Sequence, residues 1–400
     1  MTGTPMRVAL VHDWLTGMRG GERCLEVFCE IFPDATIYTL LHVPGSVSAA
    51  IERHPIVTSP LQRLPGGERL YRYYLPLFPA AVRTLDLTGH DLILSSSHCV
   101  AKAVRVPPGA CHVSYIHTPM RYVWDQYDQY FGDGRAGLLV RMAMAALRPA
   151  LQRWDVSSNG QVHAFVANSR FVAERVRRIY GREADVIAPP VDLDRFAVST
   201  RDDGYYLVVS AFAPYKRVDL AIEAFTRMRR PLKIVGGGQD QRRLEALAGP
   251  GIEFLGQCSD DEVREAYAGC RALVFPGEED FGIVPLEAMA CGKPVIAYGR
   301  GGAVETVVPL EGTSADGAGE EWPTGVFFHE QTAGALSAAV DTFEAARHRF
   351  DPERIRRHVE RFDRPRFRRA VEAYVTARYE AFRGRPAPAA AGSAGAGRAE

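Results

Sequence analysis

Short, continuously apolar segments alternate with longer helical patterns along most of this 400-residue chain. Each apolar segment is about 4–8 residues long, and most are followed by a polar or Gly/Pro turn. An apolar run without polar alternation is typical of a strand buried on both faces, as in a parallel sheet covered by helices. In the first half of the chain such runs are residues 6–11, 91–95, 111–117, 162–168 and 185–188. They predict an α/β domain with a doubly wound sheet.

The pattern stops at Pro189 and Pro190 and restarts after a turn-rich segment, residues 197–204. The second half predicts a further series of strands and helices, with one strand about every 20–25 residues. The strands are expected at residues 205–210, 232–235, 252–255, 271–275 and 294–298, and the helices at 217–228, 239–248, 260–268 and 284–290. This series indicates a second doubly wound domain.

The length of the chain agrees with two domains, because 400 residues are too many for one ordinary core. We expect a first Rossmann-like domain at residues 1–195 and a second at 204–362. A last helix is expected within 363–384, and the Ala/Gly/Pro-rich residues 385–400 are expected to be a disordered tail.

Charge and cysteine content exclude several classes of protein. The 48 basic and 48 acidic residues cancel, which argues against a nucleic-acid binder. Seven scattered cysteines without a Cys-x-x-Cys pair argue against a disulfide framework or a zinc site. No stretch has the roughly 20 unbroken apolar residues of a membrane-spanning helix, and residues 1–10 lack the layout of a secretory signal. We therefore expect a soluble, cytoplasmic protein.

Ligands of doubly wound sheets bind at the carboxyl ends of the strands, so candidate residues are sought directly after strands. Gly20 and Gly21 precede the first helix, where paired glycines let a phosphate or sugar approach the backbone. An ordinary strand-to-helix turn is the alternative, and the spacing is not the Gly-x-Gly-x-x-Gly of a nicotinamide dehydrogenase. His117 ends a predicted strand two residues before Pro119, where it can meet a substrate. The alternative is a structural histidine bonded to the backbone.

In the second half, Lys216 and Arg217 stand at the start of a predicted helix, where the helix dipole disfavours cations. An anionic ligand such as a diphosphate would stabilise them there. Gly237 is the middle residue of three glycines, whose amides can form an anion-binding nest, although a tight turn is the alternative. Asp192 and Asp194 superficially resemble an Asp-x-Asp metal clamp. They lie in the segment that leaves the first domain, so we reject a metal site and expect one of them to cap a turn.

The most informative segment begins with the acidic residues 278–280, which precede Phe281 and Gly282 and a predicted helix. Gly282 permits close approach of a ligand, and the amides of residues 281–283 are unpaired donors at the helix start. Glu287 lies within about the first turn, where its carboxylate suits the diol of a ribose. The alternative is that residues 278–280 are solvated acids and that Glu287 only interacts with the helix dipole. This alternative does not explain the apolar residues around them or Gly282.

Glu279 and Glu287, separated by seven residues, resemble the Glu-x7-Glu signature of retaining glycosyltransferases with the two-Rossmann (GT-B) fold, in particular glycosyltransferase family 4. The other matching segments are residues 279–288, 292–297, 214–217, 168–172 and 189–192, and the glycine-rich first loop. The resemblance covers the chain to about residue 383. Within the family, the chain looks most like bacterial mannosyltransferases that build O-antigen or other surface polysaccharides.

The resemblance implies two domains facing one cleft, a C-terminal helix packed back on the first domain, and catalysis without a metal or cofactor. It implies that Lys216 holds the donor diphosphate, that Gly21 approaches the phosphate and that Glu287 binds the ribose. The implied catalytic residues are His117, against the reacting face of the sugar, and Glu279, which contacts the transferred sugar. The full implied donor-binding set is Gly20, Gly21, Ser210, Lys216, Arg217, Gly237, Phe281, Gly282, Ile283 and Glu287.

Ser210 marks one departure from the family pattern. Many relatives carry an Arg six residues before the diphosphate Lys, and this chain has Ser210 at that position. We expect Arg217 or an amide of the glycine-rich loop to substitute for the missing cation.

The function implied is retaining transfer of a hexosyl group, with mannose from GDP-mannose as the expected donor, to a glycan or lipid-linked acceptor. A UDP-sugar donor and a sugar-nucleotide epimerase on the same fold are the alternatives. Retention allows either a carboxylate nucleophile or front-face attack with the departing phosphate as base. Front-face transfer is favoured, because no isolated Asp or Glu stands beside His117 in the sequence.

One further segment is basic and amphipathic. Four arginines interrupt an apolar stretch: Arg135, Arg141, Arg148 and Arg153. Residues 71–78 are also aromatic and basic. The alternative is a helix that packs against the core, because such a helix can have the same amphipathic pattern. For an enzyme with a lipid-linked acceptor, however, the pattern indicates peripheral contact with the inner face of the cell membrane.

Overall fold

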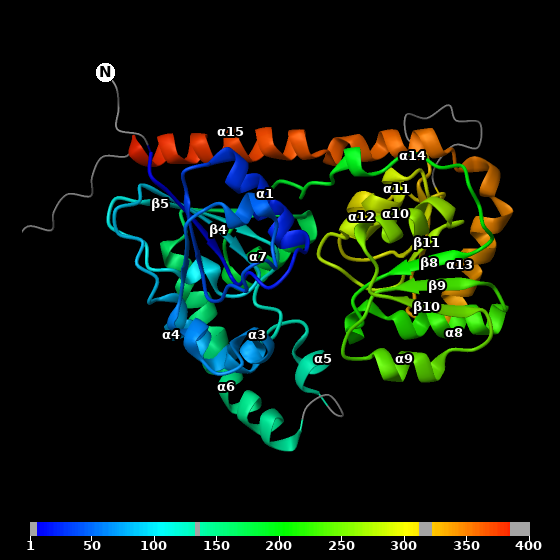
Figure 1. Ribbon diagram of the computed structural model, residues 1–400, viewed down its shortest axis with the longest axis horizontal. Coiled ribbons are helices and arrows are strands. Elements are labelled where there is room, and N and C mark those ends of the chain that lie inside the picture. Colours follow the sequence, from blue (N-terminus) through cyan, green and yellow to red (C-terminus); the bar gives the residue numbers. More distant parts are fainter. Residues whose placement is uncertain (1–5, 133–136, 312–321, 385–400) are drawn as a thin grey trace, which may run out of the picture.

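The computed structural model describes residues 6–132, 137–311 and 322–384, in which the strands form two separate parallel sheets (Figure 1). The first sheet has the strand order β3-β2-β1-β4-β5-β6-β7. Its strands are β1 Val8–His12, β2 Thr36–Thr39, β3 Ile56–Thr58, β4 Leu92–Ser97, β5 Cys111–Ile116, β6 Ala164–Ala167 and β7 Ala184–Val186. The reversal of strand order at β1 and β4 is that of a doubly wound fold.

The second sheet has the strand order β10-β9-β8-β11-β12-β13, with the same reversal at β8 and β11. Its strands are β8 Tyr206–Val209, β9 Leu232–Val235, β10 Ile252–Gly256, β11 Leu273–Phe275, β12 Val295–Tyr298 and β13 Gly325–Phe328. The prediction of two doubly wound domains is therefore confirmed.

Helices cover both faces of each sheet, which explains why the strands are apolar on both faces. In β1, Val8 and Leu10 pack into one core cluster and Ala9 and Val11 into the cluster on the opposite face. The helices of the first domain are α1 Gly20–Ile31, α2 Ala49–Glu52, α3 Gly67–Leu70, α4 Phe78–Val82, α5 Tyr127–Phe131, α6 Leu138–Ser157 and α7 Arg170–Tyr180. Those of the second are α8 Val218–Met228, α9 Gln241–Leu247, α10 Asp260–Gly269, α11 Ile283–Ala290, α12 Ala303–Thr306, α13 Ala333–Ala345 and α14 Pro352–Val359.

Three strands were not predicted from the sequence: β2, β3 and β13. β2 and β3 are short, contain Thr36, Thr39 and Thr58, and lie at one edge of the first sheet, where β3 is not buried. An edge strand needs no continuous apolar run, so its sequence carries little signal. β13 lies at an edge of the second sheet and begins with Gly325, whose added Cβ would lie 2.1 Å from the carbonyl oxygen of Val295 on β12.

The last helix, α15 Arg364–Arg383, returns from the second domain and runs along the first (Figure 1). Phe367 stacks on Phe28 of α1 and meets the ring of Tyr115 on β5 edge-on, with centroid separations of 6.0 and 5.8 Å. Arg364 also forms ion pairs with Glu26 and Glu30 of α1. The expected packing of a C-terminal helix on the first domain is confirmed, whereas the predicted tail, residues 385–400, lies outside the described residues.

Among the described residues, no helix combines the length and the apolar character that crossing a bilayer requires. All seven cysteines are free thiols, and all except Cys258 are buried.

The first prediction concerns the attachment of α15. Phe367 is 3% exposed, so Phe367→Ala should leave a cavity between α15, α1 and β5 and lower the free energy of unfolding by about 3–5 kcal/mol. Urea denaturation followed by circular dichroism measures this change. Glu372→Ala, at an exposed position of the same helix, is the control and should change stability by less than about 0.5 kcal/mol. A loss below about 1 kcal/mol for Phe367→Ala would show that α15 contributes little to the first domain.

The second prediction concerns His112 of β5, whose Nε2 lies 2.9 Å from Ser95 Oγ. Burial lowers the pKa of His112 to about 3, whereas in the unfolded chain the pKa is about 6.5. Below about pH 6.5 the unfolded state therefore binds a proton that the folded state does not, and stability falls as the pH falls. Between about pH 7 and pH 5 this one group costs about 2 kcal/mol.

The measurement is the difference in unfolding free energy between these two pH values. His112→Gln should remove about 2 kcal/mol of the loss seen in the wild type. The same substitution at His348, which is exposed, should leave the loss unchanged. An equal pH dependence in wild type and His112→Gln would contradict the assignment of a neutral, buried His112.

Candidate active site

The acidic loop, residues 276–282, connects β11 to α11 and lies against η6, the short 3-10 helix Pro214–Lys216. Gly277 allows this contact, since a Cβ there would lie 2.8 Å from the carbonyl oxygen of Tyr215. Gly282 begins α11 in the left-handed region, with φ +90°, so a side chain at this position would strain the backbone. No side-chain hydrogen bond caps this end of α11 among the described residues. The first amides of the helix are thus available to a ligand, as the sequence predicts.

Lys216 and Glu279 form an ion pair across this contact, with Nζ and Oε1 2.5 Å apart and both side chains less than one-fifth exposed. Burial acts to lower the pKa of Lys216, but the carboxylate of Glu279 outweighs it, so that the pKa is raised above its usual value. Lys216 is therefore a permanent cation at neutral pH. The structure places it beside Glu279 and the start of α11, where an anionic ligand would compete with Glu279 for its charge.

Glu287 lies further along α11, where the phenol of Tyr267 donates a hydrogen bond of 2.9 Å to its Oε2. Burial raises the pKa of Glu287. The hydrogen bond from Tyr267 fixes one carboxylate oxygen, and the carboxylate retains lone pairs for further donors. The contacts of the two glutamates in the signature therefore differ: Glu279 is paired with a cation and Glu287 with a buried phenol.

On the first domain, His117 follows β5 and belongs to a buried hydrogen-bonded chain. Its Nε2 lies 2.8 Å from Ser96 Oγ, which lies 3.0 Å from His12 Nδ1, while the side-chain amide of Asn168 donates to the carbonyl oxygen of His117. Burial lowers the pKa of His117 well below its usual value, so the ring is neutral at pH 7. Gly21 lies directly beside it, because a Cβ on Gly21 would be 3.6 Å from His117 Nε2. The structure thus brings together two residues that the sequence predicted separately.

The sequence analysis missed Asp13, which holds the loop that follows β4. Its carboxylate accepts four backbone N–H bonds of 2.6–2.9 Å from residues 98–101 and lies 3.1 Å from His98 Nδ1. Burial lowers the pKa of His98 to about 3. The signal for Asp13 was its place directly after β1, the same criterion that selected His117. Its oxygens are occupied by backbone donors, so it holds the loop rather than facing a ligand.

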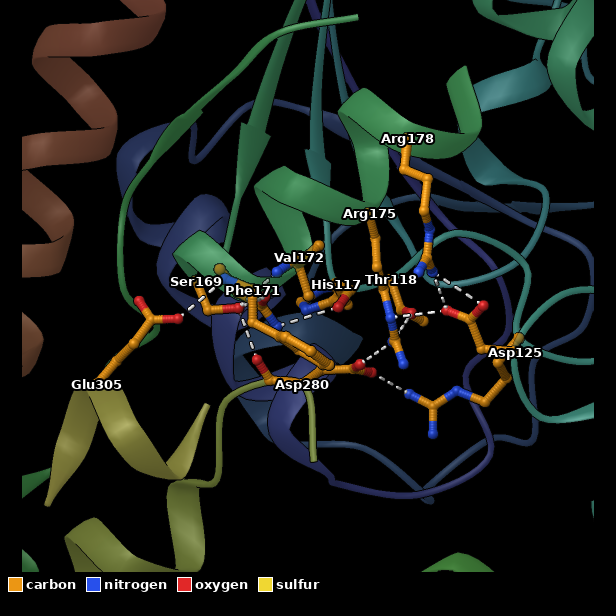
Figure 2. A network of polar contacts seen from close by, with 12 residues as sticks. His117, Thr118, Asp125, Ser169, Phe171, Val172, Arg175, Arg178, Asp280 and Glu305 are labelled. Carbon is orange, nitrogen blue, oxygen red and sulfur yellow. Dashed lines mark hydrogen bonds and ion pairs between the residues drawn. The ribbon is translucent and has the colours of Figure 1, made fainter. Parts of the chain in front are cut away.

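A network of ion pairs and hydrogen bonds joins the acidic loop to the first domain (Figure 2). Asp280 forms an ion pair of 2.7 Å with Arg121 and a second pair with Arg175 of α7. Its carbonyl oxygen accepts a hydrogen bond of 2.6 Å from Ser169 Oγ. Glu305 of α12 accepts hydrogen bonds from the first amides of α7, those of residues 170 and 171. The carboxyl ends of β5, β6 and β11 therefore meet at this network.

Two contacts show how closely the domains approach beside this network. A Cβ on Gly20 would lie only 2.8 Å from Cδ1 of Ile283, the first residue of α11. Arg175, which reaches Asp280, also donates a hydrogen bond of 3.2 Å to Thr118, directly after His117. The start of α1, the start of α11 and the segment after His117 are thus parts of one site.

Arg121 is the second residue that the sequence analysis missed. Its guanidinium carbon lies 5.6 Å from the centre of the Tyr215 ring, next to Lys216. Its positive charge also acts to lower the pKa of Lys216 and of His117. Arg121 therefore lies among the predicted site residues of both domains, although nothing near it in the sequence reveals this position.

Two other residues of the predicted donor site, Arg217 and Ser210, have side chains that contact other partners. Arg217, with φ +52°, starts α8 and places its guanidinium near Asp219 and Gln331, at 3.4 and 3.3 Å. Ser210 donates a hydrogen bond to the carbonyl oxygen of its neighbour Ala211. Neither contact joins the Lys216–Glu279 pair.

The three glycines at 236–238 have a packing role that the sequence analysis did not identify. A Cβ on Gly236 would lie 1.9 Å from the carbonyl oxygen of Ser210, and one on Gly238 would lie 2.8 Å from that of Phe212. Gly237 accepts a hydrogen bond from the Phe212 amide and faces the side chains of Gln241 and Gln257. The close packing of two loops accounts for the glycines on either side of Gly237.

We expected Asp192 or Asp194 to cap a turn, and for Asp192 the structure shows the place at a turn but no side-chain bond. Asp192 precedes η5, Leu193–Arg195, but its carboxylate makes no capping bond, and its carbonyl oxygen accepts the bond from Arg195 instead. Its φ of −83° and ψ of 91° belong to an extended segment that crosses between domains. Within the described ranges, no three or more His, Cys, Asp or Glu side chains are arranged to hold a metal ion.

Two family models match adjoining parts of the chain. Glycosyltransferase Family 4 matches residues 19–195, and Glycosyl transferases group 1 matches residues 192–358. The boundary between the two matches falls where the chain leaves the first sheet and enters the second.

Curated relatives match parts of the chain. An uncharacterized glycosyltransferase of Methanocaldococcus jannaschii is 39% identical over 112 residues, covering 27% of this chain and 32% of the relative. A GDP-mannose-dependent phosphatidylinositol monomannoside mannosyltransferase of Mycolicibacterium smegmatis is 31% identical over 203 residues, covering 42% and 52%. The O-antigen chain mannosyltransferase C of Escherichia coli is 32% identical over 105 residues, covering 24% and 28%. The chain therefore spans about half or less of these relatives' lengths.

Solved structures share the fold over nearly the whole chain. The Anabaena protein HepE, in complex with UDP and glucose, has a TM-score of 0.67 at 19% identity, covering 93% of this chain and 100% of that one. Sucrose-phosphate synthase from Thermosynechococcus elongatus has a TM-score of 0.70 at 19% identity, covering 94% and 100%. The two family models together span residues 19–358, and the three relatives are named as a glycosyltransferase and two mannosyltransferases. Because the two halves of the chain match these two glycosyltransferase models, the chain is a glycosyltransferase of the family 4 type.

Proposed function

We propose that this protein transfers a hexosyl group from a nucleotide diphosphate sugar to a glycan or lipid-linked acceptor, and that the sugar is mannose from GDP-mannose. One observation carries the proposal. The Lys216–Glu279 pair lies at the uncapped start of α11, and Asp280 joins the same loop to the domain that carries His117. The choice of mannose rests on the mannosyltransferases among the relatives.

The cations and helix ends of the site suit a diphosphate. Lys216 would bind its oxygens, and the amides at the start of α11 would add neutral donors and the positive end of a helix dipole. Arg121, rather than Arg217, would supply the second cation that the family pattern places at Ser210, because Arg121 is the guanidinium beside Lys216. Positive charge there stabilises the leaving group, where negative charge develops in the transition state. We propose that these groups replace a metal ion.

Glu287 would bind the ribose hydroxyls and Glu279 the transferred sugar. His117 is neutral, so it would hydrogen-bond a sugar hydroxyl rather than act as a cation. Asp13, a carboxylate whose charge acts on the pKa of His117, is occupied by four backbone amides and is a poor nucleophile. We therefore retain front-face transfer: the acceptor oxygen bonds to the anomeric carbon, the bond from that carbon to the phosphate oxygen breaks, and the acceptor proton passes to the departing diphosphate. The configuration is retained.

The runner-up is a UDP-sugar donor, which the UDP and glucose complex of a structural neighbour favours. A panel of GDP- and UDP-sugars, assayed by mass spectrometry with a mannosylated acceptor, separates the two donors. We expect hexose transfer from GDP-mannose, unchanged by EDTA. Conversion of the donor sugar without acceptor would indicate an epimerase, and activity restored only by Mn²⁺ after EDTA would overturn the metal-free mechanism.

The third prediction separates the two glutamates. Glu279→Gln weakens contacts to the transferred sugar, where a misplacement of about 1 Å can cost about 10²-fold in rate. It should therefore lower kcat strongly without raising the Kd of free nucleoside diphosphate, because Lys216 remains and no longer pairs with a carboxylate. Glu287→Gln should raise KM and nucleotide Kd with little change in kcat, since ribose contacts are equal in ground and transition states.

Tyr267→Phe is the matched control for Glu287, because it removes only the hydrogen bond that orients this carboxylate. It should raise KM less than Glu287→Gln does. Reversed effects of the two glutamate variants would reverse their roles, and two unaffected variants would show that the family's donor site does not operate in this chain.

A further inference from the structure

The first half of α6 projects from the body of the first domain (Figure 1). Of residues 138–147, which we call the α6 arm, only Met144 is buried. Leu138, Leu139 and Met142 are 68%, 82% and 63% exposed. A helix of this kind gains little stability from tertiary packing, and its apolar side chains remain in water unless another surface covers them.

The second half of α6 is, in contrast, anchored firmly. Asp155, which is fully buried, forms an ion pair of 3.0 Å with Lys102 and accepts hydrogen bonds from Trp124 and Tyr180. Arg148 donates to the carbonyl oxygen of Val123. The arm is thus the more exposed half of a helix whose other half is fixed in the domain.

A second exposed apolar segment lies at the same end of the domain. In residues 70–77, which include the 3-10 helix Tyr71–Leu77, Tyr73 is 73% exposed and Leu77 48%. Tyr71 and Leu75 of this segment pack in the same core cluster as Met144 and Leu151 of α6, so the two segments cover one cluster. Of the thirteen large apolar side chains exposed in the described residues, eight belong to these two segments.

The charged residues of these two segments are all basic. Residues 70–77 and the α6 arm contain no Asp or Glu, while α6 carries Arg141, Arg148 and Arg153. Apolar side chains, an exposed tyrosine and arginines without acids are the composition that binds the headgroup region of an anionic bilayer. In a two-fold dimer, both copies would bring these arginines into one interface, and neither the α6 arm nor residues 70–77 would supply acids to pair with them.

We propose that the α6 arm and residues 70–77 form a docking surface for an anionic membrane, with Leu138, Leu139 and Met142 entering the headgroup boundary. The surface belongs to the first domain and involves none of the residues assigned to the donor. Its binding can therefore be measured independently of the proposed transferase activity.

The test is flotation of the full chain with vesicles of phosphatidylcholine alone or with about 30% phosphatidylglycerol. The wild type should bind the anionic vesicles and release them in high salt. Leu139→Asp combined with Met142→Asp should lower the partition coefficient at least about tenfold, and Arg153→Glu about fivefold or more. Leu247→Asp, at an exposed position on α9 of the other domain, is the matched control and should bind as the wild type does.

Thermal unfolding of each variant verifies that it is folded, and Arg153→Glu tests the charge without altering the apolar arm. Absence of wild-type binding to anionic vesicles would overturn the proposal, as would equal binding by the double variant. Analytical ultracentrifugation provides the remaining measurement. A wild-type dimer that becomes monomeric in the double variant would also overturn the proposal, because this face would then join two copies of the chain.

Discussion

The ion pairs of Asp280 with Arg121 and Arg175 are the interaction on which the arrangement of the site depends. The Asp280 and Arg175 side chains are about nine-tenths buried. Burial of a carboxylate costs several kcal/mol unless partners of opposite charge replace its water, and two guanidinium groups do so here. Because Asp280 stands between Glu279 and Phe281, these ion pairs position the entire acidic loop against the first domain.

A second connection between the domains supports the same arrangement. The chain crosses between the domains twice, and the two crossings are hydrogen-bonded to each other: the Val191 amide donates to Phe362, and the Arg364 amide donates to Val191. Beyond this point α15 is fixed on the first domain by Phe367 and Arg364. The domains are thus joined covalently at the two crossings and electrostatically at Asp280. Breaking the ion pairs of Asp280 would leave each sheet intact and weaken the attachment of the acidic loop to the domain that carries His117, because only the hydrogen bonds of Ser169 and Glu305 would remain in this network.

The fold was largely predictable from the sequence, and the site only in part. Buried strands such as β11 and β12 carry continuous apolar runs, and Gly282 marks the left-handed backbone at the start of α11, so local sequence was sufficient. The partners of Asp280 could not be found in this way. Arg121 and Arg175 lie 159 and 105 residues away in the sequence, and only the packing of two domains brings them together.

The arginine that many relatives carry at position 210 shows the same difference between what local sequence reveals and what only the packing of the domains reveals. The resemblance implied that Ser210 replaces an arginine, and the expected substitute was Arg217 or an amide of the glycine-rich loop. In the structure Arg217 turns toward Asp219, while Arg121 from the other domain lies beside Tyr215. The roles of Lys216, Glu279 and Glu287 toward a donor stay predictions, since they depend on a ligand rather than on the fold.

The most direct test of this account is the steady-state kinetics and nucleotide affinity of Asp280→Asn beside Asp125→Asn. Asp125 pairs with Arg175 and Arg178 within the first domain, so its variant disturbs the same guanidinium without crossing between domains. If Asp280 assembles the site, Asp280→Asn should lower kcat about 10²-fold with nucleotide Kd nearly unchanged, and Asp125→Asn should have a small effect. Full turnover in Asp280→Asn, or equal losses in both variants, would contradict the account.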